Sequence, residues 1–281
     1  MFAEDRMPAT LDDSEYARTV ARLLRTTEET IELTDGSPKQ AWSSGPRLAE
    51  LRDRYTAAVT NAASMAVPDA YDPTPLGLRR ARRTVSDYYA DRGVEIEPAQ
   101  IVLCASTSEA YTWLAKLLGH AGDRIRIPKP SYPLFEHLLG LEGLETEPDT
   151  LAFHGQWRRT GIGGGASDIA VAVHPNNPTG HYLRPETLQH LHDAYNAVAV
   201  DEVFLDYPVD SDTSKTSLAL VAECDDPGLH FVISGISKVC GLPGLKLGWI
   251  VVDGPEKAVD TALNRLSYIA DAFLSPNDIV Q

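Results

Sequence analysis

The sequence predicts an α/β fold in which helices cover both faces of a mostly parallel central sheet. Short, apolar, β-branched runs recur along the chain, and turn or helix signals bound each of them, as expected for strands that are buried on both faces. Segments with helical patterning separate these runs, and strands that alternate with helices form parallel sheets. The chain has 281 residues, of which 43% are hydrophobic, so it can bury a substantial core.

The N-terminal part is predicted to be helical. Residues 11–31 have the pattern of an amphipathic helix, the stretch 34–47 contains the Gly, Pro and Ser residues of a loop, and a second helix is expected over 47–65. The regular alternation of strands and helices begins only after this part. We therefore expect an N-terminal helical arm over 1–65 and a large domain over 66–281.

Within the large domain, short apolar strands are expected with helices between them. The strands are expected at 101–104, 124–127, 169–173, 197–200, 231–234 and 247–252. The helices are expected at 78–91, 108–118, 133–140 and 185–196. Pro133 and Pro185 each open one of these helices, because proline is well tolerated in the first helical turn. The last six residues, PNDIVQ, are expected to start a further helix.

Charge and cysteine content argue against several functions. A formal net charge of −15 is the opposite of the clustered basic surface that nucleic acid requires. The three cysteines lie far apart without a CxxC pair, which argues against a zinc site or a disulfide framework. The N-terminus is acidic, unlike a signal peptide, and no apolar stretch approaches the roughly 18 residues of a membrane span. We expect a cytoplasmic protein that binds neither nucleic acid nor membrane.

Two motifs suggest other chemistry but have simpler explanations. GIGGGAS, at 161–167, follows no strand and fits neither GxGxxG nor a P-loop, so it is expected to be a surface loop. His190 and His192 are two residues apart on a predicted helix and therefore do not face each other. No metal site is expected.

Polar side chains gather where the predicted strands end. In a sheet of this kind, ligands bind at the carboxyl ends of the strands. Each residue type alone has a simple explanation, such as a helix cap for Ser108, a turn for Asn177 or a solvated strand end for Asp201. Together they are better explained as one site. The residues that follow the strands are Ser106, Thr107 and Ser108, then HPNNPTG at 174–180, then Asp201, and then Ser237 and Lys238.

Six segments resemble the signature blocks of one enzyme family, the class I/II aminotransferases, which are fold type I pyridoxal-phosphate (PLP) enzymes. Three of them are HPNNPTG (174–180), DEVFLDY (201–207) and SGISKVCGLPGLKLGW (234–249). YDPTPLG (71–77), ASTSEA (105–110) and PKPSYPLF (128–135) match further blocks in the same order. The similarity runs from about Tyr71 to the end and is weaker before, where ELTDGSP (32–38) resembles the family's substrate-side segment. The resemblance implies the large domain of the PLP-dependent transferase fold.

The resemblance also implies a cofactor and a reaction. Lys238 matches the lysine that forms a Schiff base with PLP and then shuttles a proton. Asp201 matches the carboxylate that keeps the pyridine nitrogen protonated. Asn177 matches the amide that hydrogen-bonds the phenolic oxygen, and Tyr132 matches the aromatic residue that stacks on the ring. The implied activity is transfer of an amino group between an L-amino acid and a 2-oxo acid.

The cofactor phosphate is expected at the N-terminus of the helix that begins near Ser108, where free N–H groups and the helix dipole favour an anion. Ser106 and Thr107 occupy the same turn. Lys246 stands where the family usually has a phosphate-binding arginine. Tyr71 matches a tyrosine that reaches the phosphate of the neighbouring subunit, which implies a homodimer with a shared active site.

Three positions depart from the family pattern. Phe204 replaces a tyrosine that usually gives a second hydrogen bond to the phenolic oxygen, so Asn177 would carry this contact alone. Lys246 supplies a charge without the bidentate geometry of arginine. Gly235 occupies the usual position of a serine, which leaves Ser234 as a possible substitute. None of these changes removes a catalytic group.

The chain is also shorter than the family pattern. It ends at Gln281, before the C-terminal small domain that in the family supplies an arginine for the substrate carboxylate, so that arginine is not assigned in this sequence. The sequence is a fragment, or the small domain is a separate chain, or the protein is a truncated relative. The residues leave open a PLP-dependent lyase, decarboxylase or cyclase, and an inactive truncated relative. They do not identify the amino-acid substrate, although Trp42 and Ser43 are candidates for its pocket.

Overall fold

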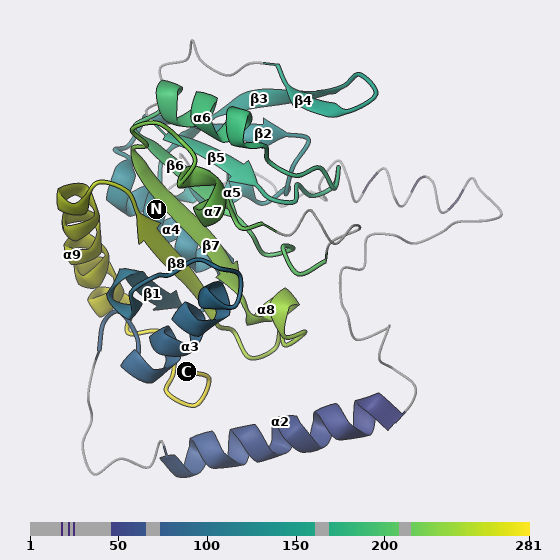
Figure 1. Ribbon diagram of the computed structural model, residues 1–281, viewed down its shortest axis with the longest axis vertical. Coiled ribbons are helices and arrows are strands. Elements are labelled where there is room, and N and C mark those ends of the chain that lie inside the picture. The colour runs from purple at the N-terminus through teal and green to yellow at the C-terminus, as the bar shows by residue number, and fades with distance from the viewer. Residues whose placement is uncertain are drawn as a thin grey trace, which may run out of the picture.

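The protein contains an eight-stranded sheet with strand order β1-β8-β7-β6-β5-β2-β3-β4 (Figure 1). The computed structural model describes residues 18, 22, 25, 46–65, 74–160, 169–207 and 215–281. The strands are β1 (Ile101–Cys104), β2 (Arg124–Lys129), β3 (Glu145–Phe153), β4 (Trp157–Arg159), β5 (Ile169–Val173), β6 (Ala197–Asp201), β7 (Leu229–Gly235) and β8 (Gly248–Asp253). The helices are α2 (Pro46–Met65), α3 (Arg79–Ala90), α4 (Thr107–Leu118), α5 (Phe135–Leu141), α6 (Pro185–Ala194), α7 (Ser217–Val221), α8 (Ile236–Val239) and α9 (Glu256–Phe273). The predicted α/β fold is confirmed.

Strand direction places the carboxyl ends of six strands at one edge of the sheet. In the series β3-β2-β5-β6-β7, each strand is parallel to the next. Strand β8 is antiparallel to both β7 and β1, so β1 runs in the same direction as β7. The carboxyl ends of β1, β2, β3, β5, β6 and β7 therefore lie at a common edge, which is where doubly wound sheets bind ligands.

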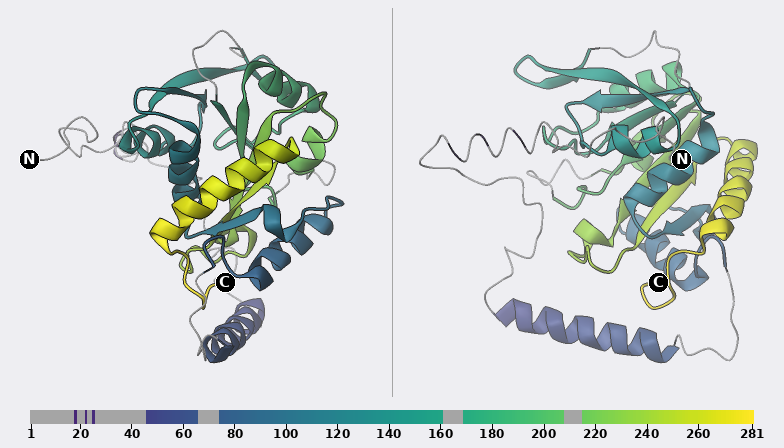
Figure 2. Two further views of the ribbon diagram at one scale, coloured as in Figure 1. Left: turned by 90° about the vertical axis from the view of Figure 1, so that its left-hand side faces the viewer. Right: turned by 180° about the vertical axis from the view of Figure 1, so that it is seen from behind.

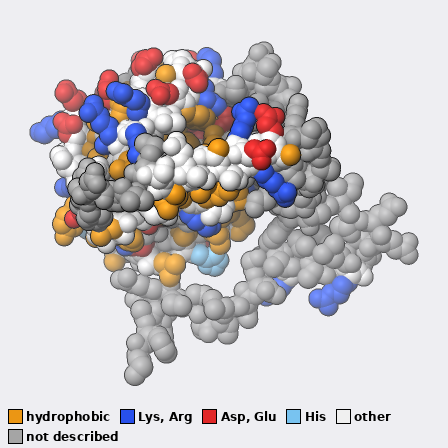
Figure 3. Space-filling model, turned by 90° about the horizontal axis from the view of Figure 1, so that it is seen from below, with side chains coloured by type: hydrophobic (Ala, Val, Ile, Leu, Met, Phe, Trp, Pro, Cys, Tyr) orange, Lys and Arg blue, Asp and Glu red, His pale blue; other side chains and the backbone are white. Residues whose placement is uncertain are grey.

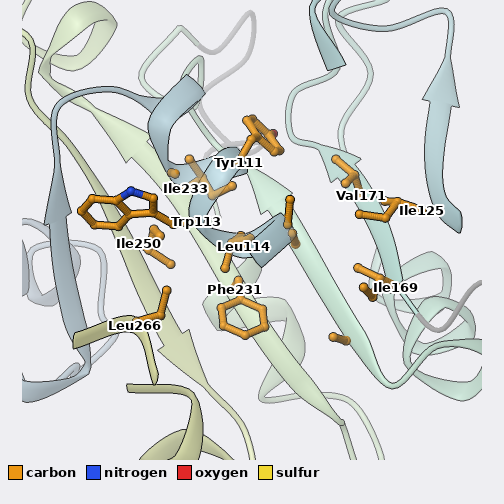
Figure 4. Close-up of a cluster of buried hydrophobic side chains, with 14 of the residues drawn as sticks. Tyr111, Trp113, Leu114, Ile125, Ile169, Val171, Phe231, Ile233, Ile250 and Leu266 are labelled. Atoms are coloured by element: carbon orange, nitrogen blue, oxygen red, sulfur yellow. The ribbon is translucent and has the colours of Figure 1, made fainter. Parts of the chain in front are cut away.

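Helices cover both faces of this sheet. Helices α4 and α9 contact each other and β8 on one face, and α5 contacts α4; α9 lies across this face in Figure 2. On the other face, α3 contacts β1, and α6 and α7 contact β6 and β7. Successive strand residues alternate between the two layers: Phe231 and Ile233 pack beneath α4, whereas Val232 packs on the side of α3. Figure 4 shows the larger of these cores beneath α4.

The N-terminal part is described only in places. Helix α2 lies apart from the sheet in Figure 1, and most of its described side chains are exposed. The prediction of a helix over 47–65 is confirmed. The helix predicted over 11–31 lies outside the described residues except for 18, 22 and 25, which are helical.

All six predicted strands and the four predicted helices of residues 66–281 are confirmed, with boundaries that shift by up to two residues. Strands β3 and β4 were not predicted, because Pro148 and several charged residues interrupt the apolar pattern there. Helix α5 begins at Phe135 and not at Pro133, because the Phe135 N–H donates to the carbonyl of Tyr132 and makes a turn first.

The C-terminal residues also differ from the prediction. The segment PNDIVQ forms a capped turn, and the structure assigns no helix to it. The N–H groups of Ile279 and Val280 donate to the side-chain oxygen of Asn277, at 3.1 and 3.3 Å. This is the hydrogen bonding of a helix N-cap followed by a single turn.

No helix in the described ranges is long and apolar enough to cross a membrane. On the face seen in Figure 3, Lys and Arg side chains are intermixed with Asp and Glu side chains. The described surface on this side therefore lacks the single-sign basic patch that would bind nucleic acid.

Candidate active site

The ends of β5, β6 and β7 are joined by backbone hydrogen bonds just beyond the strands. The His174 N–H donates to the carbonyl of Asp201 at 2.8 Å, and the Glu202 N–H donates to the carbonyl of Ile233 at 2.8 Å. Asp201 is the last residue of β6, and Lys238 lies in α8, directly after β7. The two residues predicted to be catalytic thus follow neighbouring parallel strands.

Asp201 is a buried carboxylate with an ordered set of donors. Its Oδ1 accepts a hydrogen bond from the N–H of Val203 at 2.9 Å, and its Oδ2 accepts one from the hydroxyl of Tyr111 at 2.9 Å. Burial raises the pKa of Asp201 to about 6, although these two hydrogen bonds act in the opposite direction. Among the described residues, no Lys, Arg or His forms an ion pair with Asp201. A buried carboxylate of this kind favours a cationic ligand.

Lys238 is half-buried and contacts the loop that follows β6. Its Nζ lies 5.3 Å from the centroid of the Phe204 ring, within the range of a cation–π interaction. Its carbonyl accepts a hydrogen bond from the hydroxyl of Tyr207 at 3.0 Å. The loop that carries Phe204 therefore packs against Lys238, and Phe204 has no hydroxyl to offer a ligand.

The N-terminus of α4 is shaped to receive an anion. The helix begins at Thr107, one residue earlier than predicted, because Ser106 is the N-cap and its Oγ accepts from the Glu109 N–H at 3.1 Å. In the described part of the chain, no group accepts a hydrogen bond from the N–H of Thr107 or Ser108. A Cβ on Gly248 would lie 3.2 Å from the Thr107 nitrogen, so glycine lets β8 lie close against this turn.

Tyr132 and Asn177 lie on two loops that a buried amide connects. Asn176 donates from its Nδ2 to the carbonyl of Pro130 at 3.1 Å and thus holds the two loops together. Tyr132 and Asn177 are both half-buried. Burial raises the pKa of Tyr132, and the charge of Asp201 adds to this effect, which places the ring in the electrostatic field of that carboxylate.

The structure explains the glycine at position 235 and excludes Ser234 as its substitute. A Cβ on Gly235 would lie 2.7 Å from the carbonyl oxygen of Leu247, so a serine would require the backbone to shift. Asp201 pairs directly with Ile233, and directly paired residues share a face of the sheet. Ser234 therefore points to the opposite face, where its hydroxyl is buried without a partner among the described residues. The suggestion that Ser234 replaces the usual serine is wrong.

The other predicted residues are less well defined by the structure. Lys246 lies in the turn before β8, with an exposed side chain and a φ of 58°, in the left-handed region. Among the described residues, no hydrogen bond joins Lys246 to Ser106 or Thr107. Tyr71 and the pocket candidates Trp42 and Ser43 lie outside the described residues.

Two buried residues beside the site were not recognised in the sequence. Tyr111 donates to Asp201 from the second turn of α4. Glu202 is 1% exposed, and it accepts hydrogen bonds from the Thr216 hydroxyl at 2.7 Å and from the Ser217 N–H at 2.5 Å. Burial raises the pKa of Glu202 to about 7. The sequence did offer one signal for Tyr111: its hydroxyl lies on the apolar face of the helix predicted over 108–118.

A metal centre finds no support in this region. Within 46–65, 74–160, 169–207 and 215–281, no group of three or more His, Cys, Asp and Glu side chains is placed to hold a metal ion. His192 of α6 and His230 of β7 do meet, with 3.3 Å between ring nitrogens, but both are buried in the protein interior.

The sheet order, the lysine after β7, the carboxylate at the end of β6 and the open helix N-terminus together define the large domain of the PLP-dependent transferase fold. Residues 53–278 match the family model described as aminotransferase class I and II. The chain belongs to this family, whose members depend on PLP.

Known relatives agree with this assignment. The chain is 28% identical over 217 residues to the S-alkyl-thiohydroximate lyase SUR1 of Arabidopsis thaliana, a match that covers 73% of this chain and 46% of the relative. It is 26% identical over 218 residues to the glutamate-pyruvate aminotransferase AlaA of Escherichia coli, which covers 72% of this chain and 51% of the relative. The chain thus spans about half the length of the curated relatives it matches.

Solved structures show the same fold. An aminotransferase from Escherichia coli superposes with a TM-score of 0.75 at 21% identity, over 100% of this chain and 70% of that one. Tyrosine aminotransferase from Leishmania infantum superposes with a TM-score of 0.74 at 18% identity, over 96% of this chain and 74% of that one.

Proposed function

We propose that this chain forms the PLP-binding part of an aminotransferase that moves an amino group between an L-amino acid and a 2-oxo acid. The observation that carries the proposal is the buried Asp201, which has no cationic partner among the described residues and lies beside Tyr132 and the lysine-bearing end of β7. A protonated pyridine nitrogen is the kind of cation that would stabilise this carboxylate.

The residues present fit PLP. Asp201 would pair with the ring nitrogen, Tyr132 would stack on the ring, and Asn177 would hydrogen-bond the phenolic oxygen. The cofactor, when bound, supplies an aldehyde and an electron-withdrawing ring that weakens bonds at the substrate α-carbon. Lys238 would supply the amine that holds the aldehyde, and its Nζ would then move the proton at the α-carbon.

The phosphate would lie at the N-terminus of α4. The N–H groups of Thr107 and Ser108 are available to it, and the hydroxyls of Ser106, Thr107 and Ser108 border the same turn. Lys246 would add charge at longer range. Because Gly235 leaves no room for a side chain, the backbone of α4 would carry most of this contact.

The larger organisation of the protein is also part of the proposal. We propose an N-terminal arm over 1–65, a PLP-binding large domain over 66–281, and a homodimer in which Tyr71 reaches the phosphate of the neighbouring subunit. The exposure of α2 supports the arm, since a helix that buries so little surface is suited to contacts with another body. A cytoplasmic location is supported by the three free cysteines.

A single-turnover reaction tests the activity. The purified chain is loaded with PLP, mixed with one L-amino acid at a time, and assayed for the matching 2-oxo acid and for the change in the cofactor absorption spectrum. We expect 2-oxo acid in an amount equal to the bound PLP, and no product from Lys238→Ala. Full turnover should resume when a second 2-oxo acid is added.

A lyase is the second candidate, because SUR1 is named as a lyase and is 28% identical to this chain. Release of ammonia or a thiol, without return of the amino group to a 2-oxo acid, would replace the aminotransferase proposal with the lyase. Bound PLP with no product from any amino acid would indicate an inactive relative.

A further inference from the structure

Tyr111 connects three parts of the candidate site. It belongs to the second turn of α4, the helix whose N-terminus would hold the phosphate, and its ring lies in the core beneath this helix (Figure 4). Its hydroxyl donates to Oδ2 of Asp201 at 2.9 Å. Both side chains are buried, at 3% and 5% exposure, so the hydrogen bond is shielded from water.

We propose that Tyr111 is a positioning residue that fixes the orientation of the Asp201 carboxylate and stabilises its charged form for a cationic ring nitrogen. The inference rests on the proposed function, because it assigns a role in holding PLP. It concerns a residue that contacts neither the substrate nor the cofactor and acts only through Asp201.

The orientation of the carboxylate follows from its two donors. The Val203 N–H holds Oδ1, and the Tyr111 hydroxyl holds Oδ2 from the opposite element, so rotation of the carboxylate would break one of these hydrogen bonds. An ionised carboxylate oxygen has two lone pairs, which leaves each oxygen able to accept one more hydrogen bond. The two donors therefore fix, before any ligand binds, the direction from which each oxygen of Asp201 can accept a further hydrogen bond.

The direction of the hydrogen bond is also defined. Burial raises the pKa of Tyr111 far above its usual value, so the phenol stays protonated and donates. The other titratable groups that face Asp201 are Glu202, whose charge raises the pKa of Asp201, and Tyr132. Tyr111 and the Val203 N–H are the two contacts that favour the charged form.

The ring of Tyr111 is held in place by other aromatic residues. It meets Phe135 edge to face, with centroids 4.8 Å apart, and Phe135 meets Tyr132 at 5.6 Å in the same manner. These contacts prevent the hydroxyl from turning away and link Asp201 to the residue expected to stack on the cofactor. A phenylalanine at 111 would keep the packing and remove only the hydroxyl.

The test compares PLP binding by the wild-type chain, Tyr111→Phe and Tyr89→Phe, measured by absorbance titration between pH 5.5 and 8.5. Tyr89 is the matched control: it is a fully buried tyrosine on α3 whose hydroxyl accepts from Trp249, on the other face of the sheet. We expect Tyr111→Phe to weaken PLP binding by about tenfold. We also expect the acid-side midpoint of binding to move up by about one pH unit, because the carboxylate takes up a proton more easily. Tyr89→Phe should change neither quantity.

A second variant tests whether Tyr111 acts through Asp201. In an Asp201→Asn background, adding Tyr111→Phe should weaken binding by less than about twofold. A tenfold further loss there would mean that the hydroxyl acts elsewhere. Wild-type affinity and an unshifted pH profile in Tyr111→Phe would refute the role of Tyr111 while leaving PLP binding intact. If the wild-type chain binds PLP no better than Lys238→Ala, the proposed function itself fails, and the role of Tyr111 fails with it.

Discussion

Glu202 provides a sharp test of the electrostatics beside the site, through the variant Glu202→Gln. Burial raises the pKa of this carboxyl from its usual 4.5 to about 7. The folded protein therefore binds more protons than the unfolded chain between these values, and the free energy of unfolding falls as the pH rises through them. At 1.36 kcal/mol per unit, a charged Glu202 costs about 3 kcal/mol above pH 7.

Glutamine carries no charge and keeps the local hydrogen bonds. Its oxygen can accept from the Ser217 N–H, and its amide can donate to the Thr216 hydroxyl. We expect Glu202→Gln to be more stable than the wild type by about 3 kcal/mol at pH 8.5. At pH 5 the difference should be below about 1 kcal/mol, because the wild-type carboxyl is then protonated in the folded state.

Urea unfolding followed by circular dichroism at pH 5 and 8.5 measures both values. The control is Glu223→Gln, which removes an exposed carboxylate whose ion pair with Lys215 is 3.5 Å long. Surface pairs of this kind contribute about 0–1 kcal/mol, so the control should change little at either pH. A Glu202→Gln variant that is no more stable than the wild type at pH 8.5 would refute the reasoning.

Three further predictions concern stability and the shape of the site. Asp149→Asn should lower the free energy of unfolding by about 3–5 kcal/mol in urea unfolding, because it leaves the buried guanidinium of Arg159 without its counter-charge; a loss below 1 kcal/mol would contradict this. Leu266→Ala, at a fully buried position of α9, should lower the free energy of unfolding by about 2–5 kcal/mol in the same assay. An unchanged midpoint would show that Leu266 is not packed in the core. Gly248→Ala should weaken PLP binding, measured by absorbance titration, because its Cβ would press on the backbone at Thr107, and wild-type affinity would rule this contact out.

Much of the fold was predictable because the strands are short, apolar and β-branched. That pattern identified β1, β2 and β5–β8 and placed Asp201 and Lys238 at strand ends. It did not identify β3 or β4, which are interrupted by proline or charged residues. β4 is the edge strand, and it pairs with β3 only at Leu151–Phe153, so Pro148 lies on a part of β3 whose outer edge is open, where proline is tolerated.

The details of the site depended on facts that a linear sequence does not contain. The opposite orientation of Ser234 follows from the register between β6 and β7, and the role of Tyr111 follows from how α4 lies on the sheet. The start of α4 at Thr107 depended on which of several adjacent hydroxyls caps the helix. The first two depend on contacts between segments that lie far apart in the chain. The third depends on a choice among adjacent residues that could each cap the helix.

The pairing of β1 with β8 has a consequence for synthesis on the ribosome. Cys104 pairs with Gly248, and β8 is the strand that connects β1 to the rest of the sheet. At about 5–20 residues per second, translation of the intervening chain takes on the order of 10 s. During that interval β1 has no strand to pair with, because β8 is its neighbour in the sheet. The nascent protein must therefore be kept from aggregating until β8 has left the exit tunnel and can pair with β1.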